Sequence, residues 1–180
     1  MNLIIEIKNP DKNITEPIEL LNSMKNWKYP RLEEIANVML SSKLSLDYAY
    51  SYGSRIFDFA KKTDQINDYV IPLLKKNPSS RRAVVNLWDP EEDSSLIKKE
   101  VPGLICMDFI IIDNKLCMTG VIRSNDVFFG WPANVYQLYM LQDYICKKLD
   151  AEIGSLTVFS VSAHIFKEQF EFIEKILRTK

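Results

Sequence analysis

The chain has 180 residues, of which 47% are hydrophobic and 26% charged, and its formal net charge is −1. This length predicts one domain over residues 1–180, and the composition is typical of a globular protein. Because the net charge is close to zero, we expect no nucleic-acid partner. Three cysteines without a C-x-x-C motif, together with a single histidine, exclude a standard zinc site and a disulfide framework. No metal is expected.

Targeting and membrane signals are missing from the sequence. The longest apolar run, from Leu104 to Ile112, contains Asp108 and is too short to cross a bilayer. The N-terminus lacks a basic region followed by a long apolar stretch, so no signal peptide is expected. We therefore expect a cytoplasmic protein without a membrane partner, whose cysteines are buried free thiols.

The first half of the chain predicts one edge strand followed by helices. Leu3–Ile7 alternates as a strand does, and Thr15 is expected to cap a helix that runs to about Asn26. Pro30 opens a second helix. Tyr48, Tyr50 and Tyr52 alternate up to Gly53, and further helices are expected from Arg55 and over residues 64–76, the latter with a kink at Pro72.

The second half predicts strands around one long helix. Two strands meet at Asp113–Asn114, which is a hairpin signal. Asn134 is the expected N-cap of the long helix that follows. The expected strands are 83–88, 105–112, 115–123 and 156–161, and a last helix is expected over 166–177. Interleaved helices and strands with a hairpin favour an α+β or mixed α/β fold with one large sheet.

Three polar clusters interrupt this pattern. Arg81 and Arg82 precede a strand, where they are either a solvated strand end or an anion site. Arg123 and Ser124 could hold a phosphate, and the adjacent Asn125 and Asp126 could read the edge of a base. The third cluster is the alternation of Ser160, Ser162 and His164, which would place all three on one strand face.

In this order the clusters resemble the thymidylate synthase family, which also contains the pyrimidine-nucleotide hydroxymethylases. The chain is most similar to the compact archaeal-type synthases. The matching segments are "YSYGSRI", "DQI", "SSRRAVVNLWDP", "VPGLICMDFIIIDNKL", "RSNDVFFGWPANVYQLYMLQDYI" and "EIGSLTVFSVSAHIF", which together span about Tyr48 to Phe166. The resemblance implies one large mixed sheet, a sheet-to-sheet homodimer, and methylenetetrahydrofolate as cosubstrate of a methyl transfer in nucleotide biosynthesis.

The resemblance also implies roles for individual residues. Arg123 and Ser124 would hold the phosphate of a pyrimidine nucleotide. Asn134 would read the carbonyl and the ring N–H of the pyrimidine, and an amide at this position suits uracil. Asp126 would sit near the base and the folate pterin, and His164 would bond the ribose. Arg81 and Arg82 would reach the phosphate bound by the partner subunit.

The nucleophile of the family is missing from its expected place. The family's catalytic cysteine follows a proline at the start of this strand, and here that position is Gly103, after Pro102. Glycine has no side chain that could add to C6 of a pyrimidine. Cys106 lies three residues further on and in a regular strand would face the other side of the sheet, unless a bulge turns it back.

The sequence departs from the family pattern at other positions as well. Phe166 stands where the family has a tyrosine hydroxyl for the ribose. Glu33 or Glu34 could stand for the family's proton-relay glutamate, and Glu34 is the better placed of the two. Because 16 residues follow His164, the family's closing C-terminal segment is expected to be absent. Folate binding is therefore in question.

Three functions remain open at this point. The first is a protein that binds a dUMP- or UMP-like nucleotide without covalent methyl transfer. The second is an active folate-dependent C5 methylase or hydroxymethylase, and the third is a catalytically inert member with an interaction role. Gly103 could also be an engineered substitution.

Overall fold

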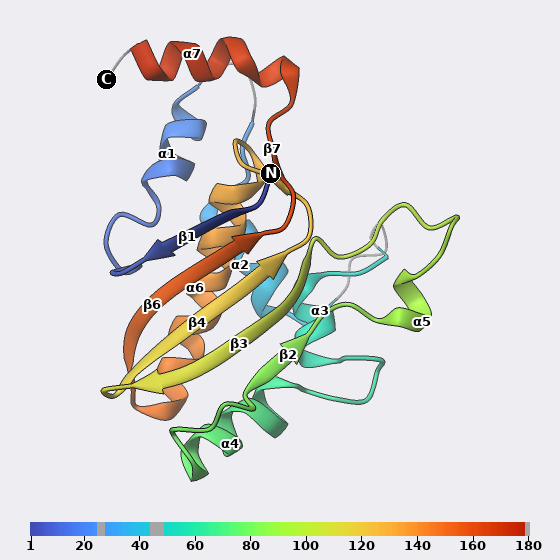
Figure 1. The fold of residues 1–180 in the computed structure, drawn as a ribbon, viewed down its shortest axis with the longest axis vertical. Coiled ribbons are helices and arrows are strands. Elements are labelled where there is room, and N and C mark those ends of the chain that lie inside the picture. Colours follow the sequence, from blue (N-terminus) through green and yellow to red (C-terminus); the bar gives the residue numbers. More distant parts are fainter. Residues whose placement is uncertain (25–27, 44–48, 179–180) are drawn as a thin grey trace.

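The computed structural model describes residues 1–24, 28–43 and 49–178. Its main feature is a five-stranded mixed sheet in which only one neighbouring pair, β4 with β6, is parallel (Figure 1). In spatial order the strands are β1 (Leu3–Ile7), β6 (Glu152–Ser160), β4 (Lys115–Ile122), β3 (Leu104–Ile112) and β2 (Val84–Asn86). Two short strands, β5 (Asn125–Asp126) and β7 (Ala163–His164), pair in parallel beyond the sheet. The expected mixed α/β fold with β1 at an edge is confirmed.

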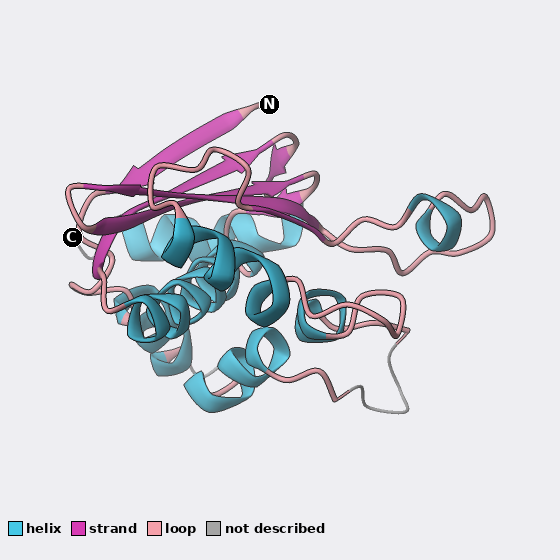
Figure 2. Cartoon of the chain, turned by 90° about the horizontal axis from the view of Figure 1, so that it is seen from below, coloured by secondary structure: helices cyan, strands magenta, loops and turns pink. Residues whose placement is uncertain are grey.

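The helices lie on one side of this sheet, and Figure 2 shows no described helix over the other side. A short helix on an arm beside the sheet is the one that stands away from the rest. The helical segments are α1 (Glu16–Ser23), α2 (Leu32–Leu40), α3 (Tyr52–Phe57), a π-helical turn (Ile66–Val70), α4 (Ile71–Lys76), α5 (Pro90–Asp93, on the arm), α6 (Gly130–Leu149), a 3₁₀ turn (Lys167–Gln169) and α7 (Phe170–Arg178).

The hairpin between β3 and β4 forms as its sequence predicts. Asp113 and Asn114 adopt φ values of 49° and 60°. Two consecutive left-handed residues make a type I′ turn, whose twist matches that of the flanking strands. On β3 the apolar Met107 and Phe109 are fully buried against the helices, whereas Asp108 is exposed on the opposite face. The strand is therefore half buried.

Helix α6 packs closely against the centre of the sheet. Gln142, which is fully buried, donates from Nε2 to the carbonyls of Leu116 (2.7 Å), Gly154 (3.2 Å) and Ser155 (3.3 Å). The register of β4 against β6 shifts just there, between Leu116 and Met118. A bulge leaves ladder carbonyls without a strand partner, and one glutamine side chain satisfies them.

Some local predictions are wrong. Thr15 makes no side-chain capping bond. Asn134 does not cap α6, because the helix begins at Gly130 and Asn134 lies one turn inside it. The alternation of Ser160 with His164 is broken by a turn at 161–162, so these residues share no strand face. Asn26 and Tyr48 lie outside the described residues.

Residues 1–24, 28–43 and 49–178 contain neither a candidate membrane span nor a cluster of metal-binding side chains. None of the helices in this part of the chain combines the length and the apolar character that crossing a bilayer requires. No three or more His, Cys, Asp or Glu side chains within it cluster in a way that could hold a metal ion. The single domain over residues 1–180 stays a prediction.

We expect Gly154→Ala to lower the free energy of unfolding by about 1–3 kcal/mol, because the core there cannot yield. A Cβ at this position would lie 2.7 Å from Cys117 Sγ and 2.8 Å from the Leu116 carbonyl oxygen. At Gly103 the nearest atom to an added Cβ is the Tyr52 hydroxyl, at 3.3 Å. Gly103→Ala is the matched control and should cost less than about 1 kcal/mol. Urea unfolding of both variants measures this, and equal losses would contradict it.

Candidate functional site

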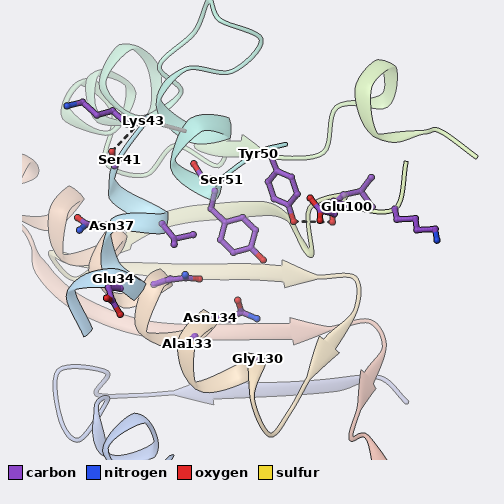
Figure 3. Close-up of a pocket in the computed structure, with 15 residues that line it drawn as sticks. Glu34, Asn37, Ser41, Lys43, Tyr50, Ser51, Glu100, Gly130, Ala133 and Asn134 are labelled. Atoms are coloured by element: carbon purple, nitrogen blue, oxygen red, sulfur yellow. Dashed lines mark hydrogen bonds between the residues drawn. The ribbon is translucent and has the colours of Figure 1, made fainter. Parts of the chain in front are cut away.

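A cavity of about 810 Å³ opens between α2, the start of α3, the end of the arm and the first turns of α6 (Figure 3). Its walls mix amides, carboxylates, tyrosines and aliphatic groups. The lining residues are Glu34, Asn37, Val38, Ser41, Lys43, Tyr50, Ser51, Tyr52, Lys99, Glu100, Val101, Gly130, Ala133, Asn134 and Gln137. A volume of this size is in the range of small-molecule sites. Of the residues predicted from the sequence, Glu34 and Asn134 line it.

Asn134 is oriented by a buried relay of polar side chains. Its Nδ2 donates to Oδ1 of Asn125 at 3.3 Å, and Nδ2 of Asn125 donates to the Ser160 hydroxyl at 2.8 Å. Asn125 is only 1% exposed and Ser160 is equally buried. Because each amide is held by the next, Asn134 presents to the cavity its carbonyl oxygen and one remaining N–H.

Glu34 accepts two hydrogen bonds from Arg31 at the start of α2. Its carboxylate accepts from the Arg31 backbone amide at 2.9 Å and from Arg31 Nη2 at 3.2 Å. These bonds, the backbone one first, lower the pKa of Glu34 below its ordinary value. A group with a lowered pKa is a poor proton donor near neutral pH, so a relay role would require Arg31 to move away.

Arg123 joins the end of β4 to the entry of β3. Its backbone amide donates to the Gly103 carbonyl at 2.9 Å, and its guanidinium donates to the carbonyls of Pro102 (2.8 Å) and Val101 (3.1 Å). The guanidinium also lies 5.8 Å from the centre of the Trp88 ring. Two of its five N–H groups are used in these bonds, so three remain for an anion. Ser124, the next residue, is exposed.

Gly103 adjoins the cavity through Tyr52. The Tyr52 hydroxyl lies 3.3 Å from where a Cβ at Gly103 would be, and it accepts from the Leu104 amide at 3.4 Å. Burial raises the pKa of Tyr52, so its proton stays on the oxygen. Tyr52 and Val101 line the cavity and also contact Gly103 or Arg123. Gly103 and Arg123 themselves do not line the cavity.

Cys106 lies on the face of the sheet that carries no helix. A register shift does occur between Leu104 and Cys106, yet Met107 and Phe109 keep the helix-side positions. Burial, and then the Asp108 carboxylate, raise the pKa of the Cys106 thiol. The bulge thus leaves Cys106 away from the cavity as a protonated thiol, which is a weak nucleophile.

Asp126 and His164 are brought side by side by the pairing of β5 with β7. Oδ1 of Asp126 accepts from the amides of Phe128 (2.9 Å) and Phe129 (3.2 Å), and Oδ2 accepts from Gln169 at 2.8 Å. Oδ1 therefore holds the loop before α6, and Oδ2 ties Asp126 to the 3₁₀ turn before α7. His164 Nδ1 lies 3.3 Å from the Ser162 carbonyl oxygen.

The ring of His164 packs edge-on against that of Phe166 at 5.0 Å, and Phe166 is 53% exposed. Phe166 follows β7 and precedes the 3₁₀ turn, and it does not line the cavity. The structure therefore places Phe166 beside His164, where it offers a ring face and no hydroxyl.

Arg81 and Arg82 are exposed and lie at the other end of the sheet. The carbonyl of the following Ala83 accepts from the Phe109 amide, six residues beyond Gly103. At about 3.3 Å per strand residue this is about 20 Å from the β3 entry. Within one chain the double arginine and Arg123 are not brought together.

Sequence reasoning gave no role to several residues of the site. In the sequence Tyr52 stands out only as part of an alternation of tyrosines, and no pattern marks Tyr29 or Asn37. Gln137 follows Asn134 by three residues, and this spacing on a helix is the signal that could have found it.

Comparison with known proteins identifies the fold and the family. The thymidylate synthase family model matches residues 12–180. The chain belongs to the thymidylate synthase family.

The archaeal relatives and solved structures agree with this assignment. A protein of Methanosarcina barkeri named "Putative thymidylate synthase" is 39% identical over 152 residues, which are 84% of this chain and 69% of the relative. A protein of the same name from Methanosarcina mazei is 36% identical over 99% of this chain and 78% of its own length. Thymidylate synthase A of Bacillus subtilis has a TM-score of 0.70 at 20% identity, covering 97% of this chain and 68% of its own. The enzyme of T4 phage has a TM-score of 0.67 at 20% identity, covering 97% and 70%.

Tyr29 secures the start of α6, and its loss should be measurable. Its hydroxyl donates to the Phe129 carbonyl at 2.6 Å and accepts from the Ala133 amide at 3.2 Å. Because α6 has no side-chain N-cap, Tyr29→Phe should lower the free energy of unfolding by about 1–2 kcal/mol at pH 8.

This loss should shrink at high pH. Burial raises the pKa of Tyr29 to about 12, so the contribution of Tyr29 to stability is complete below about pH 10 and is lost as the pH rises toward 12. Denaturant titrations of the wild type and Tyr29→Phe at pH 8 and pH 11 test this. A loss that grows between the two would contradict it.

Proposed function

We propose that this thymidylate-synthase-family chain binds a pyrimidine nucleoside monophosphate, dUMP- or UMP-like, and does so without a covalent cysteine. Arg123 and Ser124 take the phosphate, Asn134 reads the base and His164 meets the ribose. The observation that carries the proposal is Arg123, which is hydrogen-bonded to Gly103 through its backbone and keeps three guanidinium N–H groups that are not used on Val101 or Pro102, beside a residue that has no nucleophilic side chain.

The side chain of Arg123 is suited to a phosphate. Its guanidinium is held in place by two backbone carbonyls and keeps three N–H groups, and Ser124, the next residue in the chain, is exposed. A fixed guanidinium with a neighbouring hydroxyl suits a phosphate, since bidentate charge-assisted bonds are strong and little side-chain entropy is lost.

No activated nucleophile among the described residues stands near Gly103 in place of a cysteine. The nearest side-chain atom is the hydroxyl of Tyr52, whose raised pKa keeps it protonated. Cys106 faces away from the cavity and its thiol pKa is raised as well. Neither group is an activated nucleophile in the sense that addition to a pyrimidine requires.

A folate remains compatible with this cavity. At about 810 Å³ the cavity has room for a second ring system beside a pyrimidine. Gly130 and Ala133, which line it on the α6 side, take up little of this space because their side chains are small. Methylenetetrahydrofolate, if bound, would supply a one-carbon unit. The residues that would meet its ring are Glu34 and Asn134, with Asp126 behind Gly130.

We also propose a homodimer that packs through the uncovered face of the sheet. One row across this face is formed by Ile4, Phe159, Val121 and Cys106, which neighbour one another on successive strands. Ile4 is 66% exposed, although it is apolar. A second copy on this face would bury the row. In such a dimer Arg81 and Arg82 could reach the phosphate bound by the partner subunit, although they cannot reach the phosphate of their own chain.

Calorimetry with dUMP, UMP, dCMP and CMP tests nucleotide binding. We expect binding of at least one, and at least tenfold weaker binding by Arg123→Ala, because charge-assisted bonds contribute about 1.5–3 kcal/mol each. Arg178→Ala is the matched control, since Arg178 is exposed in α7 and pairs only with Glu174 among described residues. No binding of any nucleotide at millimolar concentration would contradict the proposal and favour a structural role.

The dimer is tested by Phe159→Glu. A carboxylate in the middle of the apolar row should prevent sheet-to-sheet packing, because its burial without a partner is costly. Light scattering should give a dimer for the wild type and a monomer for the variant, and the monomer should bind nucleotide less tightly because Arg81 and Arg82 of the partner are lost. A monomeric wild type would overturn the dimer.

A further inference from the structure

Gln137 carries a buried acceptor that the fold leaves unpaired. It lies on α6 one turn after Asn134, lines the cavity and is 6% exposed. Its Nε2 donates to the Ile35 carbonyl at 3.2 Å. Its Oε1 is buried and accepts no hydrogen bond from residues 1–24, 28–43 or 49–178. Buried acceptors are nearly always paired in folded proteins, so this one requires an explanation.

The orientation of this amide is set by chemistry. Turning it over would place Oε1 against the Ile35 carbonyl oxygen, and two acceptors repel each other. The nitrogen therefore stays on the α2 side and the unpaired oxygen belongs to the side facing away from Ile35. The terminal torsion of a glutamine is broad, so a small rotation brings Oε1 to the cavity surface without leaving a rotamer.

Structure alone does not account for Gln137. Gln142 on the same helix also has an unpaired Oε1, but its Nε2 contacts three carbonyls of the sheet, so its place in the core is explained. Gln137 makes one bond, to a carbonyl inside α2. An apolar side chain of similar length would fill its place without leaving an acceptor unpaired, and a residue that weakens the fold while lining a cavity points to a bound ligand.

We propose that Gln137 is a second base-reading residue, whose Oε1 accepts the ring N–H of a uracil-type pyrimidine while the Asn134 amide donates to the adjacent ring carbonyl. The two side chains are neighbours on one helix face, with Cβ atoms about 5–6 Å apart. Together they match a lactam edge, in which an N–H stands beside a C=O. A neutral cytosine has no ring N–H there, so it leaves the acceptor unpaired. This inference rests on the proposed nucleotide site and names its base.

The test compares nucleotide affinities of the wild type and Gln137→Met by calorimetry with UMP, dUMP, CMP and dCMP. The wild type should bind the uracil nucleotides at least about tenfold more tightly than the cytosine nucleotides, and in Gln137→Met this ratio should fall to within about threefold. The melting temperature of Gln137→Met should equal or exceed that of the wild type, because the unpaired acceptor is gone.

Gln142→Met is the matched control. The same replacement on the same helix removes three hydrogen bonds outside the cavity, so the melting temperature should fall while the base preference stays that of the wild type. This inference alone would be overturned if Gln137→Met bound nucleotides with the same uracil-to-cytosine preference as the wild type. It would also be overturned if the wild type preferred cytosine nucleotides. A wild type that binds none of the four would overturn the proposed function, and this inference with it.

Discussion

The close contact of α6 with the sheet is the constraint on which the remaining structure depends. Gly120 lets the helix approach the sheet, since a Cβ there would lie 2.9 Å from Leu138 Cδ1, and Gly154 lets β6 lie close to β4, since a Cβ there would lie 2.7 Å from Cys117 Sγ. Gln142 then satisfies three carbonyls where the strand register shifts. A helix held this tightly fixes its own first turns, and those turns carry Asn134 and Gln137 into the cavity. Close-packed interiors are hardly compressible, so fixing the middle of a helix also fixes the turns next to it.

The second constraint is electrostatic and lies at the entry of β3. Arg123 holds the carbonyls of Val101 and Pro102, and the Tyr50 hydroxyl donates to the Val101 carbonyl as well. The arm that precedes them is anchored by a buried ion pair of 2.8 Å between Arg55 and Asp93. These contacts fix the backbone around Gly103 without using any side chain at that position.

Several local errors of sequence reasoning share one physical cause. Asn134 looks like an N-cap, and Thr15 looks like another, because short-range hydrogen bonding favours those residue types at helix starts. In the fold, the Tyr29 hydroxyl from another segment bonds the first turn of α6, which frees Asn134 to join the relay through Asn125. Ser160 and His164 were expected on one face, but a turn separates them and Ser160 serves the same relay. Hydrogen bonds to distant segments decided the positions of Asn134 and Ser160.

The sequence by itself determined the family, the order of the elements and the hairpin, because apolar periodicity and turn residues act over short distances. It also determined that position 103 has no side chain, which no fold can change. Only the tertiary structure decided that both oxygens of Asp126 accept hydrogen bonds, one from its own loop and one from Gln169, and that Arg81 lies far from Arg123. It alone revealed the unpaired oxygen of Gln137. Hydrogen bonds between distant segments depend on positions that no local pattern encodes.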